Sequence, residues 1–160
     1  MNAWVPPSAA ERRRILRRAR TIAVVGASAN PARASNFVLT YLLSSSADYE
    51  VWPVTPRETS ILGVPAYPSL AELPGVPDIV DVFRRVDQLP AVAREAVAIG
   101  AGAFWMQLGL HSDEAVEIAS SAGLDVVSDR CIKIEHARFH GGLHLAGFDT
   151  GVISSRRTRG

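Results

Sequence analysis

The sequence predicts a single doubly wound α/β domain with a mostly parallel five-stranded sheet. Short apolar runs alternate with segments of helical character, and the intervening segments are long enough for right-handed crossovers between parallel strands. The chain has 160 residues, of which 48% are hydrophobic and 21% are charged. This length and composition are sufficient for one well-packed core.

The five expected strands are short apolar runs, which is typical of strands buried on both faces. They cover residues 22–25, 49–54, 79–83, 101–106 and 124–127. The first strand ends at Gly26, and Thr55 and Pro56 close the second. A looser stretch, residues 57–77, separates the second strand from the third and contains a capping-box pattern from Ser69 to Glu72.

Helices are expected between these strands and before the first. Ser8 and Glu11 have capping-box spacing and open a helix over residues 8–19. This helix has an arginine-rich face, and Ile15 and Leu16 on the opposite side are expected to pack on the sheet. The other expected helices cover residues 37–43, 91–99 and 114–122.

Charge and cysteine content narrow the functional classes. A net charge of +1 gives no electrostatic indication of nucleic-acid binding. The single cysteine, Cys131, excludes an internal disulfide and fits a reducing compartment. No apolar run approaches the roughly 18 residues of a membrane span, and the N-terminus lacks the apolar core of a signal peptide. We therefore expect a cytoplasmic protein that binds neither membranes nor nucleic acids.

The turn after the first strand predicts an anion site. Gly26 ends a buried strand and is followed by polar, turn-prone residues that lead into a helix. A glycine here allows a tight turn and a close approach of an anion to backbone N–H groups and the helix N-terminus. Rossmann-like domains bind a pyrophosphate at this position, and we expect a β-carbon at Gly26 to collide with the ligand or to require a strained turn. Ala27 and Ser28 follow Gly26, so the segment departs from G-x-G-x-x-G.

Arginines follow several of the expected strands at the same edge of the sheet. Because arginine suits phosphate recognition, their convergence predicts a phosphate-containing ligand. The loop residues considered are Gly26, Ala27, Ser28 and Arg33 after the first strand, Thr55, Pro56 and Arg57 after the second, Arg84 and Arg85 after the third, and Gln107 and Gly109 after the fourth.

The end of the second strand discriminates among nucleotides. NAD sites usually place an acidic residue there to bind the ribose hydroxyls. This chain has Val54, Thr55, Pro56 and Arg57 instead. An arginine suits a phosphorylated ribose, so NADP and coenzyme A are both favoured over NAD.

Five motifs, taken together, resemble those of the small stand-alone CoA-binding proteins, which are similar to the N-terminal CoA-binding domain of the succinyl-CoA synthetase α subunit. They are VVGAS (24–28), WPVTP (52–56), DIVDVFRR (78–85), WMQLG (105–109) and DRCIKIEH (129–136). The resemblance covers roughly residues 8–138. It departs from the family at Thr55, where an asparagine is frequent, although Thr-Pro is similar to the synthetase loop.

The resemblance implies a binding role for ten residues. Gly26, Ala27 and Ser28 would line the pyrophosphate with help from Arg33; Val54, Thr55 and Pro56 would border the adenosine; Arg57 would approach the 3′-phosphate; and Phe83 and Arg84 would flank the pantetheine arm. We expect the chain to divide into an N-terminal basic helix packed on the domain (1–20), a CoA-binding Rossmann-like domain (21–138) and a C-terminal tail (139–160). The expected function is binding of coenzyme A or an acyl-CoA without the phosphohistidine and nucleotide modules that the synthetases use. The residues do not identify a protein partner.

Two other functions remain open. An NADP-dependent reductase is one, although Lys133 is the only lysine and no Tyr-x-x-x-Lys pair exists. The other is a protein-interaction module with a vestigial nucleotide cleft.

Two smaller features have competing interpretations. Cys131 could meet the CoA thiol in a mixed disulfide, but a packed side chain is the expected role. His136, His140 and His144 have helical spacing for a zinc site, but Gly141 and Gly142 would interrupt the helix.

Overall fold

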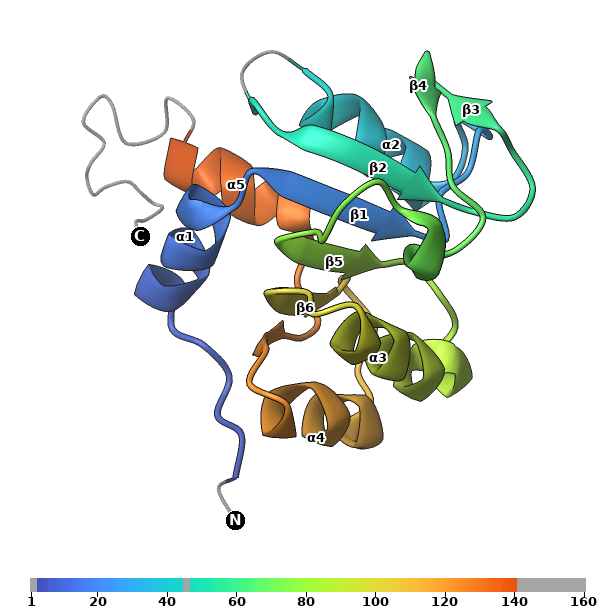
Figure 1. The fold of residues 1–160 in the computed structure, drawn as a ribbon. Helices are drawn as coiled ribbons and strands as arrows, with labels where there is room; N and C mark the ends of the chain where they lie inside the picture. The colour runs from blue at the N-terminus through green and yellow to red at the C-terminus, as the bar shows by residue number, and fades with distance from the viewer. Residues whose placement is uncertain (1–2, 45–46, 141–160) are drawn as a thin grey trace.

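The computed structural model describes residues 3–44 and 47–140, which form a parallel five-stranded sheet between two layers of helices (Figure 1). The strand order is β2-β1-β5-β6-β7, and every adjacent pair is parallel. The strands are β1 (Thr21–Val25), β2 (Glu50–Val54), β5 (Ile79–Val82), β6 (Ala103–Met106) and β7 (Asp125–Val127). The predicted fold class is confirmed, and each strand begins or ends within two residues of its predicted limits.

The helices cover the sheet on both faces because each face is apolar. The helices of the first layer are α1 (Ala9–Arg18), α2 (Ala34–Leu42) and α5 (Ile132–His140), and those of the second are α3 (Leu89–Ala98) and α4 (Asp113–Ser121). Leu16, Leu39 and Ile132 pack with Trp105 in the first layer. Leu89 packs with Phe104 in the second. Alternating sheet residues therefore supply two separate cores.

Short elements fill the stretch between β2 and β5. An antiparallel hairpin is formed by β3 (Ser60–Ile61) and β4 (Val64–Pro65), followed by the 3₁₀ helix η1 (Leu70–Glu72). A second 3₁₀ helix, η2 (Val86–Gln88), precedes α3. The Ser69–Glu72 pattern makes no backbone cap, because the Ser69 hydroxyl bonds the Glu72 carboxylate at 3.1 Å instead.

The capping box of α1 is confirmed in full. The Glu11 N–H donates to Ser8 Oγ at 3.2 Å, and the Ser8 N–H donates to Glu11 Oε1 at 2.8 Å. Ile15 and Leu16 are buried in the first core. The helix therefore packs on the sheet with its apolar side.

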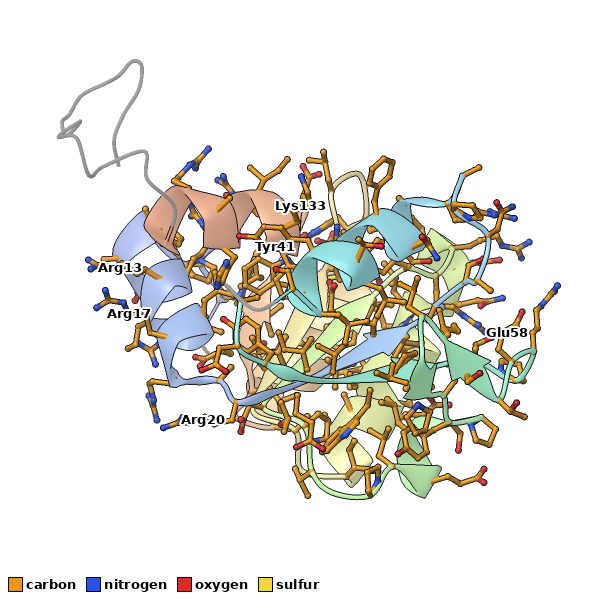
Figure 2. The ribbon with its side chains drawn as sticks, turned by 90° about the horizontal axis from the view of Figure 1, so that it is seen from above. Arg13, Arg17, Arg20, Tyr41, Glu58 and Lys133 are labelled. Carbon is orange, nitrogen blue, oxygen red and sulfur yellow. The ribbon has the colours of Figure 1, made fainter. Side chains whose placement is uncertain are left out.

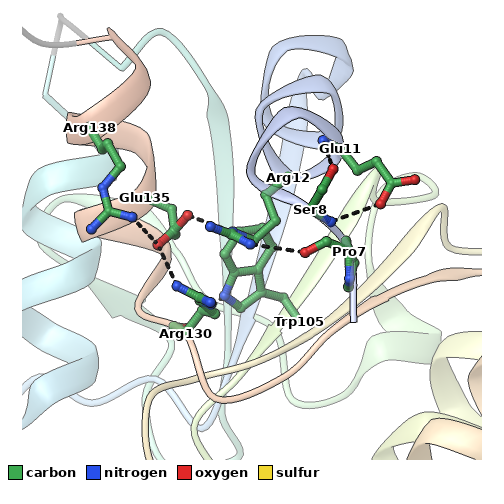
Figure 3. A network of polar contacts seen from close by, with 8 residues as sticks. All are labelled: Pro7, Ser8, Glu11, Arg12, Trp105, Arg130, Glu135 and Arg138. Atoms are coloured by element: carbon green, nitrogen blue, oxygen red, sulfur yellow. Dashed lines mark hydrogen bonds and ion pairs between the residues drawn. The ribbon is translucent and has the colours of Figure 1, made fainter. Parts of the chain in front are cut away.

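A buried ion pair joins α1 to α5, a helix that the sequence pattern did not predict (Figure 3). Arg12 Nε donates to Glu135 Oε1 at 2.7 Å, and both side chains are less than a tenth exposed. Arg130 and Arg138 approach the other oxygen of Glu135 at 3.6 and 3.4 Å. The α5 helix ends at His140, past the expected boundary at residue 138, and Gly141, Gly142 and His144 lie outside the described residues.

Loss of the buried partner on α1 should destabilise the fold. Arg12→Ala leaves Glu135 buried with only the two longer contacts, so we expect the free energy of unfolding to fall by about 3 kcal/mol or more. Urea denaturation measures this change. The control is Arg14→Ala on the same helix, which removes an exposed 3.7 Å pair with Asp125 and should cost less than about 1 kcal/mol. Equal losses in the two variants would contradict a structural role for the buried pair.

Candidate functional site

The candidate site lies at the carboxyl ends of β2, β1 and β5. The chain leaves β1 toward α2 in one layer and leaves β5 toward α3 in the other, so the two loops diverge between neighbouring strands. This divergence is a topological switch point, where α/β sheets usually bind ligands. All ten residues predicted for the site lie in these strand ends and the loops that follow them.

Gly26 forms the expected tight turn at the end of β1. Its φ of +86° is in the left-handed region, and its N–H donates to the Val54 carbonyl at 3.0 Å. A β-carbon would overlap the Phe83 carbonyl oxygen and lie 3.1 Å from Arg84 Cδ. The left-handed φ confirms the strained turn expected for a side chain at this position, and a β-carbon would in addition meet the backbone after β5.

The segment after Gly26 presents unpaired backbone donors. The N–H groups of Ser28, Ala29, Ala34 and Ser35 form no hydrogen bond within the described part of the chain, and the last two open helix α2. The loop is held by its own polar contacts: Ser28 Oγ accepts from the Asn30 N–H at 3.0 Å, and the Asn36 amide donates to the Ser28 carbonyl at 3.0 Å. Such a group of N–H donors at a helix N-terminus suits a phosphate.

Three arginines in the loops at this edge have no ion-pair partner among the described residues. Arg33 is exposed at the N-cap of α2, and Arg57 is exposed after β2. Arg84 is half-buried and donates to the Gln88 side chain at 2.9 Å. Arg85 differs, since it pairs with Asp87 at 3.1 Å. Three positive side chains are thus available at the site.

The loop after β2 borders the candidate site and is held by hydrogen bonds. Thr55 is buried, and its N–H donates to the Tyr67 carbonyl at 2.8 Å. The Thr55 hydroxyl accepts from the Arg57 N–H at 3.2 Å, which fixes the backbone that carries Arg57. Val54 is also buried, whereas Pro56 is exposed to solvent.

Asp81, near the end of β5, is a buried acid that the sequence analysis did not single out. It has no exposed surface, and neither carboxyl oxygen has a hydrogen-bond partner in the described structure. It pairs in register with Val24 on β1 and Trp105 on β6. Burial raises its pKa well above the usual value, so the side chain is held as the neutral acid. The available signal was an acidic residue inside the apolar run 79–83.

Several other residues named from the sequence have structural contacts. Gln107 is buried and accepts the Ile132 N–H at 3.0 Å. Cys131 is half-buried against the first core. His136 is buried, with Nδ1 2.7 Å from the Tyr41 hydroxyl. In the described residues no three His, Cys, Asp or Glu side chains group as a metal site, and no helix has the length and apolar character for a bilayer crossing.

Comparison with known proteins identifies the region that carries this site. The CoA binding domain family matches residues 20–137. The uncharacterized protein YneT of Bacillus subtilis is 46% identical over 131 residues, which cover 82% of this chain and 96% of that protein. A hypothetical protein from Pyrococcus horikoshii OT3 is 35% identical with a TM-score of 0.79, covering 87% of this chain and 99% of that structure.

A larger enzyme contains a similar region. The ADP-forming acetate–CoA ligase I of Archaeoglobus fulgidus is 28% identical over 125 residues, which cover 71% of this chain. The match spans only 18% of that ligase. The similarity therefore concerns one part of the enzyme.

The contact between Gly26 and Phe83 predicts a stability effect. Gly26→Ala should lower the free energy of unfolding by about 2–5 kcal/mol, because it combines a left-handed side chain with overpacking. Thermal or urea unfolding measures the loss. Gly109→Ala is the matched control, since Gly109 has a φ of +87° but no atom within 4 Å of a β-carbon; it should cost about 1–2 kcal/mol. Equal losses of unfolding free energy in the two variants would show that the Phe83 contact does not add to the cost of the Gly26 substitution.

The raised pKa of Asp81 predicts a pH-dependent stability. The folded chain keeps the Asp81 proton above pH 4, where the unfolded chain loses it, so stability falls as pH rises toward the pKa of the folded state. Asp81→Asn cannot ionise and should therefore gain stability relative to wild type as pH rises, by up to about 1.4 kcal/mol per pH unit. Urea unfolding at pH 4, 6 and 8 measures the difference. The exposed Asp87→Asn should follow the wild-type profile, and a parallel profile for Asp81→Asn would refute the assignment.

Proposed function

The chain belongs to the CoA-binding domain family, and from this premise we propose that the site at the carboxyl ends of β1, β2 and β5 binds coenzyme A or an acyl-CoA without ligase activity. The observation that carries the proposal is the group of four N–H donors between Ser28 and Ser35 that have no partner among the described residues, together with Arg33, Arg57 and Arg84 in the loops at the same edge. Coenzyme A has a pyrophosphate and a separate 3′-phosphate. The site offers donors for both.

Each part of the ligand has a matching group. Gly26, Ala27 and Ser28 would line the pyrophosphate, and Arg33 would neutralise it. Val54, Thr55 and Pro56 would border the adenosine, with Arg57 on the 3′-phosphate. Phe83 and Arg84 would flank the pantetheine arm. The hydrogen bonds of the Thr55 loop order the backbone that carries Arg57 before a ligand binds. This order supports the placement of Arg57 on the 3′-phosphate.

The histidines support binding rather than phosphoryl transfer. Two histidine side chains are described. His136 is buried against Tyr41, and His111 is held between Ser128 and Asp113 at 2.6 and 2.8 Å. His111 is exposed, but both of its ring nitrogens are engaged, and His136 is buried. Among the described residues, the site contains backbone donors and arginines, which bind phosphates but form no thioester.

A second candidate, an interaction surface, has support from α1. Arg13 and Arg17 are exposed on this helix, and Arg20 is exposed just beyond it; in Figure 2 they lie at the end of the molecule opposite Glu58, which follows β2. An acidic partner could contact this face without covering the proposed CoA site. The two functions are therefore compatible.

The 3′-phosphate provides a sharp test of the ligand. If Arg57 binds it, dephospho-CoA should bind more weakly than CoA by about 1.5–3 kcal/mol, and by less if solvent screens the exposed side chain. Arg57→Ala should weaken CoA while sparing dephospho-CoA, and calorimetry on the four combinations gives the coupling energy. Arg33→Ala is the control, because it should weaken both ligands equally through their shared pyrophosphate.

Three results would contradict the proposal. Equal affinity of wild type for CoA and dephospho-CoA would remove the role of Arg57. Tighter binding of NADP than of CoA would favour a reductase. Steady formation of acyl-CoA from CoA, ATP and a short carboxylic acid would show ligase activity.

A further inference from the structure

A second pocket lies beyond the proposed CoA site, beside the end of β7. Its volume is about 530 Å³. It is lined by Trp4, Pro6, Pro7, Arg12, His111, Val127, Ser128, Asp129 and Arg130. None of the ten residues assigned to CoA lines it. It nevertheless lies at the same carboxyl edge of the sheet, because Ser128, Asp129 and Arg130 directly follow β7.

The pocket combines apolar walls with one available guanidinium. Trp4 and Val127 provide apolar surface, and the Trp4 indole N–H is fixed to the Val126 carbonyl at 3.2 Å. Arg12 is buried, and its guanidinium donates to Glu135 and to the Pro7 carbonyl. The Arg130 side chain is 44% exposed, lies 3.6 Å from Glu135 and makes no hydrogen bond within the described residues. Arg130 is therefore the free donor of this pocket.

The charge around the pocket favours an anion. Glu135 faces three guanidinium groups, those of Arg12, Arg130 and Arg138 (Figure 3). Among the described residues that line the pocket, Asp129 carries the only carboxylate, and its Oδ1 accepts the Gly109 N–H at 2.6 Å. Two arginines, Arg12 and Arg130, line the same pocket. One free guanidinium between apolar walls matches a carboxylate at the end of a hydrocarbon chain, whereas a phosphate typically gathers several N–H donors.

The spacing of the strands separates the pocket from the Gly26 turn by about the length of a pantetheine arm. This is where an acyl group on the CoA sulfur would lie. From β1 to β7 the sheet crosses three strand spacings, or about 14 Å. The pantetheine arm has the chain length of about four extended residues, also about 14 Å. A pyrophosphate at the Gly26 turn therefore allows the sulfur to reach the end of β7. Leu108, exposed after β6, offers an apolar contact on the way.

We propose that this pocket receives the acyl group of a CoA thioester whose far end carries a carboxylate, and that Arg130 binds this carboxylate. The inference rests on the proposed function, since it needs the CoA moiety at the Gly26 turn. It adds a ligand class, the CoA thioesters of short dicarboxylic acids. It also assigns a specificity-determining residue outside the CoA-binding loops.

Calorimetry with CoA, pentanoyl-CoA and glutaryl-CoA tests the inference, because the two thioesters differ only in a terminal methyl or carboxylate. Wild type should bind glutaryl-CoA about threefold to tenfold more tightly than pentanoyl-CoA. Arg130→Ala should abolish this preference and leave the affinity for CoA unchanged. Arg138→Ala is the matched control: it also removes a partner of Glu135, but Arg138 does not line the pocket, so the preference should persist.

The failures of the two proposals are distinguishable. If CoA binds but the two thioesters bind equally, or if the preference survives in Arg130→Ala, the acyl-pocket assignment is overturned and the CoA site stands. If CoA itself does not bind, the proposed function is overturned, and the inference falls with it. Thermal unfolding of each variant shows whether it is folded, and Arg130→Gln, which keeps the aliphatic stem, replaces Arg130→Ala if the latter is unfolded.

Discussion

The close contact between the Gly26 turn and the Phe83 carbonyl determines the geometry of the carboxyl edge. Gly26 can approach Phe83 only because it has no side chain, and its φ of +86° turns the chain directly from β1 into the loop before α2. The Gly26 and Ala27 N–H groups both donate to the Val54 carbonyl of β2, at 3.0 and 3.3 Å. One turn thus connects the ends of three strands. The donors of the following loop remain unpaired because the turn directs the chain away from the sheet.

Asp81 lies close to this turn in the sheet. Its side chain is fully buried, unlike those of the arginines in the neighbouring loops. Arg33 and Arg57 are exposed and Arg84 is half-buried, whereas Asp81 is fully buried between apolar neighbours, which raises its pKa and favours the neutral acid. An unsatisfied buried carboxyl costs about 1–3 kcal/mol. An ionised Asp81 would also repel the phosphates expected above it, so neutrality of this acid is compatible with anion binding at the edge.

The sequence pattern predicted the sheet well because its strands are short apolar runs that alternate with helical segments. This alternation is typical of a doubly wound α/β fold. The pattern brought together the loops of the candidate anion site for the same reason, since strand order determines which loops meet; anion binding there stays a prediction. It failed for α5, where Lys133, Glu135 and Arg138 interrupt the apolar pattern and the stabilising contacts come from Arg12, more than a hundred residues away. It predicted the tight turn at Gly26 but missed the close contact with Phe83, because no local pattern shows that Phe83 lies against it.

Glu135 contacts segments that lie far apart in the sequence, which local sequence patterns could not place together. Its carboxylate holds Arg12 of α1 and approaches Arg130 of the loop after β7, so the N-terminal helix and the far end of the sheet share one buried anion. Arg12 takes the short bond at 2.7 Å and Arg130 the long contact at 3.6 Å. Because Glu135 is already neutralised by Arg12, the guanidinium of Arg130 keeps donors for another carboxylate. The same network that stabilises α1 therefore leaves one cation available at the carboxyl edge, three strands from the turn at Gly26.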